Sequence, residues 1–130
     1  MIEWNDSFAT GHAMVDHDHQ QLIKALNELE TALQQGASEA HLVEILSFLI
    51  CYAIEHFARE EALMERVQCP VRAGNCQAHA RLKARLAEWV PLLKKEGAPE
   101  HARMIHDELS VWIQEHILKI DCRLRNCHEA

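Results

Sequence analysis

Ionisable side chains stand at inward-facing positions of the apolar stripes of this chain, and this pattern restricts the folds that it can adopt. Apolar residues recur in four successive segments at the spacing of an amphipathic helix. Five histidine or glutamate residues are in phase with the leucine and isoleucine of these stripes, namely His19, His56, Glu60, His79 and His116. Burying them without partners would cost roughly several kcal/mol each, so they must be paired, hydrogen-bonded or bound to metal.

Glycine and proline mark the connections between the four segments. These connections fall at residues 36–38, 69–74 and 97–99. Gly36 can end the first helix in a left-handed conformation, Ser38 can cap the second, and Pro99 suits the first turn of the fourth. Pro91 lies within the third segment and predicts a kink or an early end. We therefore predict an all-α, up-down-up-down antiparallel four-helix bundle with an N-terminal arm, a single domain over residues 1–130.

The charge pattern argues against two classes of partner. Thirteen lysine and arginine residues against twenty aspartate and glutamate residues give a net charge of −7, and the basic residues form no tract. We therefore expect neither nucleic acid nor an anionic membrane as a partner. No apolar run approaches the roughly 18 residues of a membrane span, and the first residues do not resemble a signal peptide. We expect a cytoplasmic protein, and the sequence does not indicate its oligomeric state.

The five cysteines do not show the two close pairs of a structural zinc site. A disulfide framework is not expected in a reducing compartment. Cys51 lies in an apolar run and is interpreted as a small buried core residue. The other four are expected to be more accessible, and their spacing leaves open whether they are redox-active: Cys69, Cys76, Cys122 and Cys127.

The spacing of the inward-facing ionisable residues favours a metal site. His56 and Glu60 are four residues apart and share one helix face. Asp121 follows His116 by five residues, and a short carboxylate at a fraying helix end can still turn inward. Imidazole and carboxylate together suit iron, manganese or zinc, and carboxylates that can bridge favour a pair of ions. A lone histidine on an apolar face is usually a hydrogen-bonded core residue, but that interpretation would have to hold on four helices independently.

The remaining polar residues near these stripes have simpler interpretations. Asp16 and Asp18 suit the start of a helix, and Glu61 is expected to be a solvated neighbour of Glu60. Met64 is interpreted as core or pocket lining. Six further histidines are expected to be solvated or capping, with a supporting role near His19 open only to the first two: His12, His17, His41, His101, His106 and His128.

Taken together, the motifs of the chain resemble those of the bacterial hemerythrins, in the same order and over nearly its whole length. The motifs are Val15–His19, His56–Met64, Cys69-Pro70 followed by His79, and Trp112–Ile117 with Asp121. Trp4 and Gly11 also fall where that family has them. The resemblance implies a four-helix bundle that holds two non-haem iron ions (Fe²⁺/Fe³⁺), oxo- or hydroxo-bridged when oxidised, and binds dioxygen reversibly.

The resemblance also assigns metal ligands. His19 and His56 match the two ligands of the iron that keeps an open position for the gas, and His79 and His116 match two of the three histidines on the other iron. Glu60 and Asp121 match the carboxylates that bridge the irons. The apolar wall around the gas site is matched by Leu22, Phe57, Trp112, Ile113 and Ile117. A dry pocket of this kind slows the loss of a reduced oxygen species.

One position departs from the family pattern. The family normally has histidine four residues before the position of His79, and this chain has Asn75 there, followed by Cys76. Water could fill the ligand position or it could stay vacant, Asn75 could coordinate through its amide oxygen, or Cys76 could supply a thiolate. A vacancy could also leave a mononuclear centre.

Three functions follow from these observations. The leading one is reversible binding of dioxygen, or of another small diatomic or anionic ligand, for storage, delivery or sensing, without a catalytic residue beyond the metal ligands. The second is a diiron or mononuclear metalloenzyme that reacts with peroxide, nitric oxide or oxygen, because the altered position would open the second metal to such reactants. The third is a redox sensor that uses its accessible cysteines.

Overall fold

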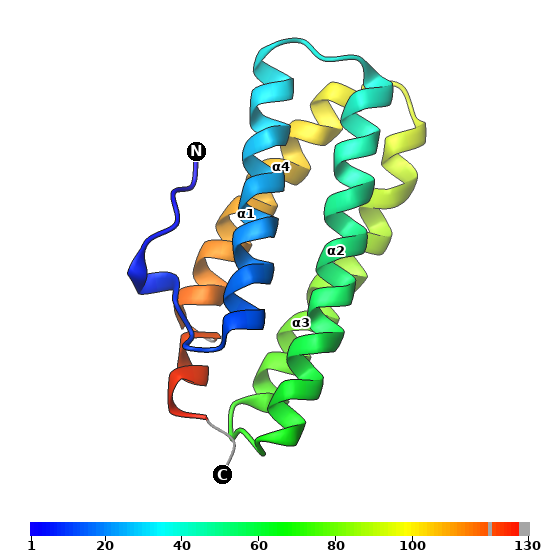
Figure 1. Ribbon diagram of the computed structural model, residues 1–130. Helices are drawn as coiled ribbons and strands as arrows, with labels where there is room; N and C mark the ends of the chain where they lie inside the picture. Colours follow the sequence, from blue (N-terminus) through cyan, green and yellow to red (C-terminus); the bar gives the residue numbers. More distant parts are fainter. Residues whose placement is uncertain (120, 128–130) are drawn as a thin grey trace.

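The computed structural model is an antiparallel four-helix bundle with a short arm along one side (Figure 1). It describes residues 1–119 and 121–127, and Ile120 and His128 lie outside this part. The four long helices are α1 (Ala13–Gln34), α2 (Glu39–Arg66), α3 (Arg72–Trp89) and α4 (Ala98–Lys119). Short 3-10 helices are η1 (Asp6–Phe8), η2 (Val90–Lys94) and η3 (Asp121–Asn126), and the described residues include no strand. The prediction of an all-α bundle is confirmed.

The helices end where the sequence predicts. Gly36 has φ +67°, a left-handed conformation that costs glycine little. The Ser38 hydroxyl accepts a hydrogen bond from the backbone N–H of His41 at 3.2 Å and caps α2. The third helix stops at Trp89, and the segment containing Pro91 continues as the 3-10 helix η2. The expected early end before Pro91 is therefore confirmed.

The apolar core forms two layers at different heights in the bundle. The larger layer joins all four helices and includes fully buried leucines such as Leu26, Leu46 and Leu109. The smaller layer lies at the end where α2 turns into α3 and η3 ends the described chain. It consists of Val15, Leu63, Met64, Cys69, Leu124 and Cys127. The inward-facing histidines lie between these two layers.

Helix α2 is long and apolar enough to cross a membrane by length and composition, with a mean hydropathy of 1.4 over its most apolar window. The expectation that no segment approaches a membrane span is therefore wrong on these two criteria. The helix packs against α1, α3 and α4, and it buries His56 and Glu60 among its apolar residues. One face of the helix is buried in the core, whereas Phe48 and Ile54 are exposed.

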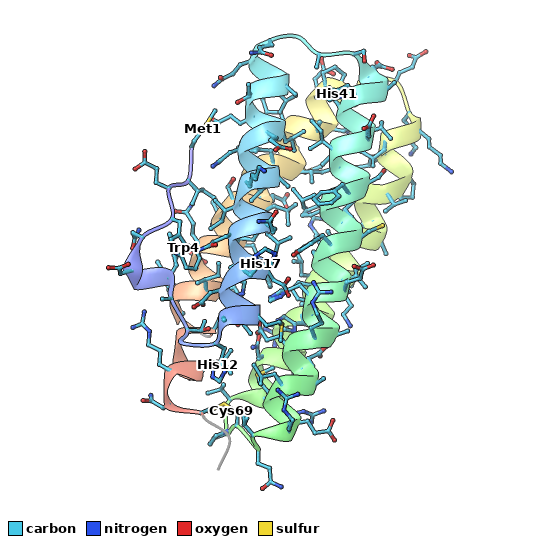
Figure 2. All side chains as sticks on the ribbon, viewed as in Figure 1. Met1, Trp4, His12, His17, His41 and Cys69 are labelled. Carbon is cyan, nitrogen blue, oxygen red and sulfur yellow. A yellow bond between two sulfur atoms is a disulfide. The ribbon has the colours of Figure 1, made fainter. Side chains whose placement is uncertain are left out.

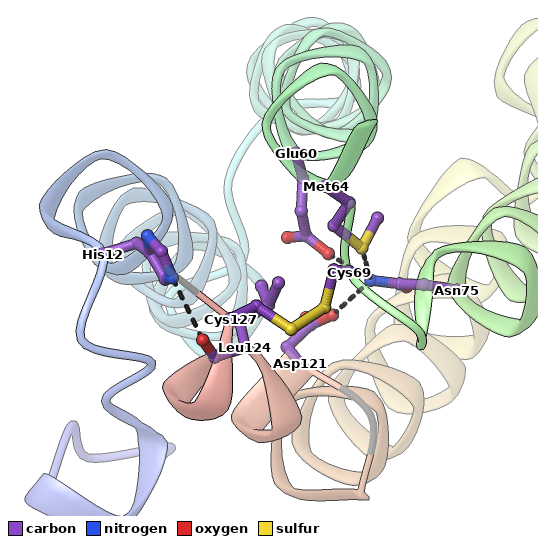
Figure 3. The surroundings of a disulfide bond; sticks show 8 residues. All are labelled: His12, Glu60, Met64, Cys69, Asn75, Asp121, Leu124 and Cys127. Carbon is purple, nitrogen blue, oxygen red and sulfur yellow. Dashed lines mark hydrogen bonds between the residues drawn. A yellow bond between two sulfur atoms is a disulfide. The ribbon is translucent and has the colours of Figure 1, made fainter. Parts of the chain in front are cut away.

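The cysteines differ from expectation. Cys69, in the turn after α2, forms a disulfide with Cys127, the residue directly after η3, although no disulfide was expected (Figure 3). The two residues are 58 apart in sequence, so spacing alone could not pair them. Cys51 is exposed and not buried, because Ile50 and Ala53 occupy the inward-facing positions of that turn of α2. The side chain of Cys122 lies outside the described part of the chain.

The N-terminal arm is fastened to both α1 and η3. The backbone N–H and carbonyl of Ile2 bond to the side chain of Asn27 on α1, at 3.1 and 2.8 Å. The guanidinium of Arg125 donates to the carbonyl oxygens of Ala9 and Ser7. The His12 ring nitrogen lies 3.0 Å from the Leu124 carbonyl oxygen. Figure 2 shows Trp4 on the arm and His12 at its lower end.

Cys127→Ser should lower the free energy of unfolding, because the disulfide closes a long loop that the unfolded chain would otherwise open. For a separation of 58 residues the loop-closure entropy amounts to about 4 kcal/mol. Urea unfolding of the oxidised protein measures the change, with the exposed Cys51→Ser as the matched control. Equal stabilities of the two variants, or free thiols at both Cys69 and Cys127 in the unfolded, unreduced wild type, would contradict the disulfide.

Candidate metal centre

Every long helix and η3 contribute a side chain to one buried polar cluster. The six sequence-predicted ligands come together in this cluster, and none is more than 5% exposed: His19, His56, Glu60, His79, His116 and Asp121. The helical phase explains this convergence, since each histidine replaces an apolar residue in a core stripe. Asp121 begins η3 directly beyond the end of α4, and this change of helix type turns its carboxylate inward.

Three of these side chains form a first metal-binding group. His19, His56 and Glu60 each place one potential ligand atom within 4.8 Å of the others. The Nε2 atoms of the two histidines are 3.1 Å apart. The His56 Nε2 atom is 2.8 Å from Oε2 of Glu60. Asp121 also reaches this group, with its Oδ2 atom 3.1 Å from the His19 Nε2 atom.

A second group lies on the other side of the same carboxylates. Glu60, His79, His116 and Asp121 again place ligand atoms within 4.8 Å of one another. The Nε2 atoms of His79 and His116 are 3.2 Å apart, and that of His116 is 3.1 Å from Oδ1 of Asp121. The Oε1 atom of Glu60 is 3.6 Å from the His79 Nε2 atom.

Both carboxylates therefore face both histidine pairs. Glu60 directs Oε2 to the first group and Oε1 to the second, and Asp121 directs Oδ2 to His19 and Oδ1 to His116. Imidazole nitrogens and carboxylate oxygens that converge without water access are the donor set of a first-row transition metal. The residues present fit a pair of cations that share two carboxylates.

Asn75 lies between the two shared carboxylates (Figure 3). Its Nδ2 donates to Oε1 of Glu60 at 2.5 Å and to Oδ1 of Asp121 at 3.0 Å. The side chain is fully buried, and its Oδ1 atom has no hydrogen-bond partner among the described residues. An amide that turned over would present this oxygen to the second group, so the geometry is compatible with coordination by Asn75. Cys76 is partly exposed, interacts with Glu61 and joins neither group.

The apolar side chains predicted to surround the gas site do lie beside the centre. They line a cavity of about 10 Å³ together with His19, His56, His116 and Asp121. All five predicted wall residues take part, namely Leu22, Phe57, Trp112, Ile113 and Ile117. A volume of this order holds about one water-sized molecule, so only a very small ligand fits without movement of the walls.

Sequence reasoning missed Asp18. It was interpreted as a residue of the helix start, but its carboxylate is 3% exposed and accepts a hydrogen bond from Nδ1 of His56 at 2.9 Å. Its position could have shown this, because Asp18 lies three residues after Val15 and four before Leu22, on their buried stripe. Asp16, in contrast, accepts hydrogen bonds from the backbone and hydroxyl of Thr10.

The other histidines within the described residues lie outside both groups. His12 contacts the Leu124 carbonyl oxygen, His17 and His41 are exposed, and His106 pairs with Asp107. His101 is partly exposed. Met64 is fully buried in the smaller core layer, as expected for core lining.

The centre perturbs the pKa values of its histidines in opposite directions. Burial opposes a charge on His19, but interactions with Asp121 and Glu60 raise its pKa to about 9. Burial lowers the pKa of His79 to about 3, despite the opposing effect of Glu60. The metal-free centre therefore keeps one ring charged and another neutral at neutral pH, and binding of a cation at His19 must release a proton.

Comparison with known proteins agrees with this centre. Residues 10–124 match the family model of the hemerythrin HHE cation binding domain. The chain belongs to the hemerythrin family.

Curated relatives in the hemerythrin family align over most of the chain. Bacteriohemerythrin of Pseudomonas aeruginosa (strain LESB58) is 28% identical over 120 residues, which are 92% of this chain and 76% of that protein. Bacteriohemerythrin of Stenotrophomonas maltophilia (strain R551-3) is 29% identical over 90% of this chain and 74% of its own length. Myohemerythrin of Riftia pachyptila is 25% identical over 94% and 89%, respectively.

Glu60→Ala should lower the metal content of this hemerythrin, because it removes the carboxylate that both groups share and leaves His56 and His79 facing a void. Elemental mass spectrometry of the purified variant measures the metal per chain. Glu61→Ala, which changes the partly exposed neighbour, is the control and should keep the wild-type content. A full metal complement in Glu60→Ala would contradict the sharing of this carboxylate.

The free energy of unfolding of the metal-free protein should be greatest near pH 6.5. His79 has a pKa of about 3 against its ordinary value of 6.5, so the unfolded chain binds the extra proton and the free energy of unfolding falls as the pH drops below 6.5. His19, with a pKa of about 9, contributes stability that is present below 6.5 and is lost as the pH rises toward 9. Urea unfolding with a chelator across this range tests both slopes, and a flat profile would contradict them.

Proposed function

We propose that this hemerythrin holds two non-haem iron ions and binds dioxygen reversibly, for storage, delivery or sensing. The observation that carries the proposal is the pair of buried histidine groups that share Glu60 and Asp121 beside a small apolar cavity. His19 and His56 would hold one ion, and His79 and His116 the other. When bound, the ions supply the electrons and the open coordination position that reversible binding of dioxygen requires.

The chain itself would select the ligand. The cavity of about 10 Å³ favours a diatomic molecule over larger oxidants. Its apolar walls are Leu22, Phe57, Trp112, Ile113 and Ile117, which offer no proton donor apart from the Trp112 indole. The rest of its lining consists of the proposed metal ligands His19, His56, His116 and Asp121. A site with few proton donors and little water protects a reduced oxygen species from protonation and loss. This supports reversible binding as the function rather than turnover.

Asn75 supports a second candidate, a metalloenzyme that reacts with peroxide, nitric oxide or oxygen. Within the described residues, the second group contains only two imidazoles, and the neighbouring Asn75 amide nitrogen donates to both of its carboxylates. An amide is a weaker ligand for iron than an imidazole, so a metal there would exchange water more readily and become open to a second reactant. From the sequence we also propose a cytoplasmic location for either function, where the Cys69–Cys127 bond would be exposed to a reducing environment. We expect no nucleic-acid or membrane partner.

Iron content and ligand binding separate these functions. Protein produced with ample iron should contain two iron atoms per chain, and its reduced form should develop an absorption change with oxygen that reverses on deoxygenation. Asn75→His should increase the retention of the second iron during dialysis against a chelator. One iron per chain in the wild type, or sustained consumption of peroxide without a reversible oxygen spectrum, would contradict oxygen carriage and favour the enzyme.

Ile113→Ala should speed the oxidation of the reduced protein in air, because the larger cavity admits water to the centre. Ile105→Ala is the matched control, since Ile105 is fully buried in the larger core layer and does not line the cavity. Both truncations should lower the free energy of unfolding by roughly 2–5 kcal/mol. Stopped-flow absorbance measures the oxidation rates, and equal rates in the two variants would contradict a protective wall.

A further inference from the structure

We propose that Asp18 is a positioning residue for His56, and that the metal position of His19 and His56 consequently fills before that of His79 and His116. The inference rests on the proposed metal centre. It concerns a carboxylate that is not a ligand itself. Asp18 comes from α1, whereas His56 and the other groups that hold Asp18 come from α2.

Three residues of α2 bind the Asp18 carboxylate from one helix face. Tyr52, His56 and Arg59 are four and three residues apart, so their side chains project in the same direction. Oδ1 of Asp18 accepts from the Tyr52 hydroxyl at 2.8 Å and from Nη2 of Arg59 at 3.0 Å. Oδ2 accepts from Nδ1 of His56 at 2.9 Å and from Nε of Arg59 at 2.9 Å. With each oxygen bonded twice, the carboxylate has one orientation.

The fixed carboxylate determines which nitrogen of His56 faces the metal. An ionised carboxylate can only accept, so Nδ1 of His56 must carry the proton. The opposite nitrogen, Nε2, lies 2.8 Å from Glu60 Oε2 and 3.1 Å from the His19 Nε2 atom, inside the first group. Asp18 thus orients the ring for coordination through Nε2, as carboxylates that support metal-binding histidines do. The positive guanidinium of Arg59 compensates the negative charge of the Asp18 carboxylate.

The second metal position lacks equivalent support. In the first position only the His56 ring is supported, because Nδ1 of His19 is buried without a hydrogen-bond partner in the described part of the chain. In the second position Nδ1 of His79 is likewise buried and has no hydrogen-bond partner among the described side chains. The carboxylate oxygen of Glu61 is 3.9 Å away, too far for a hydrogen bond. This position also has Asn75, whose amide nitrogen donates to the carboxylates that the metal would need. Ordering these groups on binding lowers the affinity of the second position. Binding at the first position displaces a proton from His19 but requires no reorientation of Asn75, so the first position should fill first.

The order of filling can be measured with zinc, a diamagnetic probe that binds the same donor types. Nitrogen-15 NMR of the metal-free protein during a zinc titration should show the His19 and His56 rings responding to the first equivalent. The His79 and His116 rings should respond only to the second. The Nδ1–H of His56 should give a signal protected from solvent exchange before any zinc is added.

Asp18→Asn keeps the size of the side chain but removes its charge. We expect the Kd for the first zinc ion to rise roughly 10–100-fold, the His56 Nδ1–H to exchange faster with solvent, and the two metal positions to fill together and no longer in order. Asp16→Asn is the matched control, because Asp16 lies two residues away on α1 and bonds to Thr10 instead. Tyr52→Phe removes one bond to Asp18 without removing the His56 contact and should retain both the protected signal and the order.

Two results would overturn the proposal: an unprotected His56 Nδ1–H in the wild type, or an unchanged filling order in folded Asp18→Asn protein. Circular dichroism establishes that each variant is folded. A wild-type chain that binds no zinc would instead count against the proposed metal centre. In that case the exchange of the His56 Nδ1–H, measured without metal, would still decide whether Asp18 positions the ring.

Discussion

The burial of two carboxylates among four imidazoles is the constraint on which the rest of this structure depends. Glu60 and Asp121 are almost completely removed from water, and they are tolerable there only because each of their oxygens faces a histidine nitrogen. Each of the four long helices brings one of these histidines, so the register between helices cannot shift by a turn without separating a carboxylate from its partners. The polar cluster thereby determines helix alignment as well as metal binding.

The apolar layers on either side give the cluster its chemical character. The larger layer excludes water from the interior of the bundle, and the smaller layer of Val15, Leu63, Met64 and Leu124 closes the opposite end. Between these layers, burial and the nearby carboxylates keep the His19 ring protonated and the His79 ring neutral at neutral pH. A hemerythrin centre in this chain is thus a polar section of an otherwise apolar core.

The sequence was sufficient for the features that follow helical periodicity. The bundle and the convergence of His19, His56, His79 and His116 depend on a period of 3.6 residues, which a single chain displays. The end of α3 follows from Pro91, which has no backbone N–H to continue the helix. Periodicity was also the signal for Asp18, but the charge of that residue favoured a helix-start interpretation. Cys51 was placed inward because its neighbours are apolar, although it stands one position away from the buried stripe.

Tertiary contacts could not be predicted in the same way. The orientation of the Asn75 amide depends on where Glu60 and Asp121 meet, 15 and 46 residues away in sequence. The Cys69–Cys127 bond depends on η3 folding back beneath the α2–α3 turn. Neither arrangement leaves a local pattern in the chain, since both are decided by the packing of segments that are distant in sequence.

The disulfide places half of the ligands of the metal centre inside a covalently closed ring and leaves the other half outside it. The covalent ring that it closes, from Cys69 to Cys127, contains His79, His116 and Asp121, whereas His19, His56 and Glu60 precede it. A protease that cut one peptide bond between α3 and α4 would therefore leave every ligand on a single covalently connected molecule. A cut between α1 and α2 would release His19 on a separate fragment. The two connections at the same end of the bundle thus differ in how much backbone damage the centre can survive.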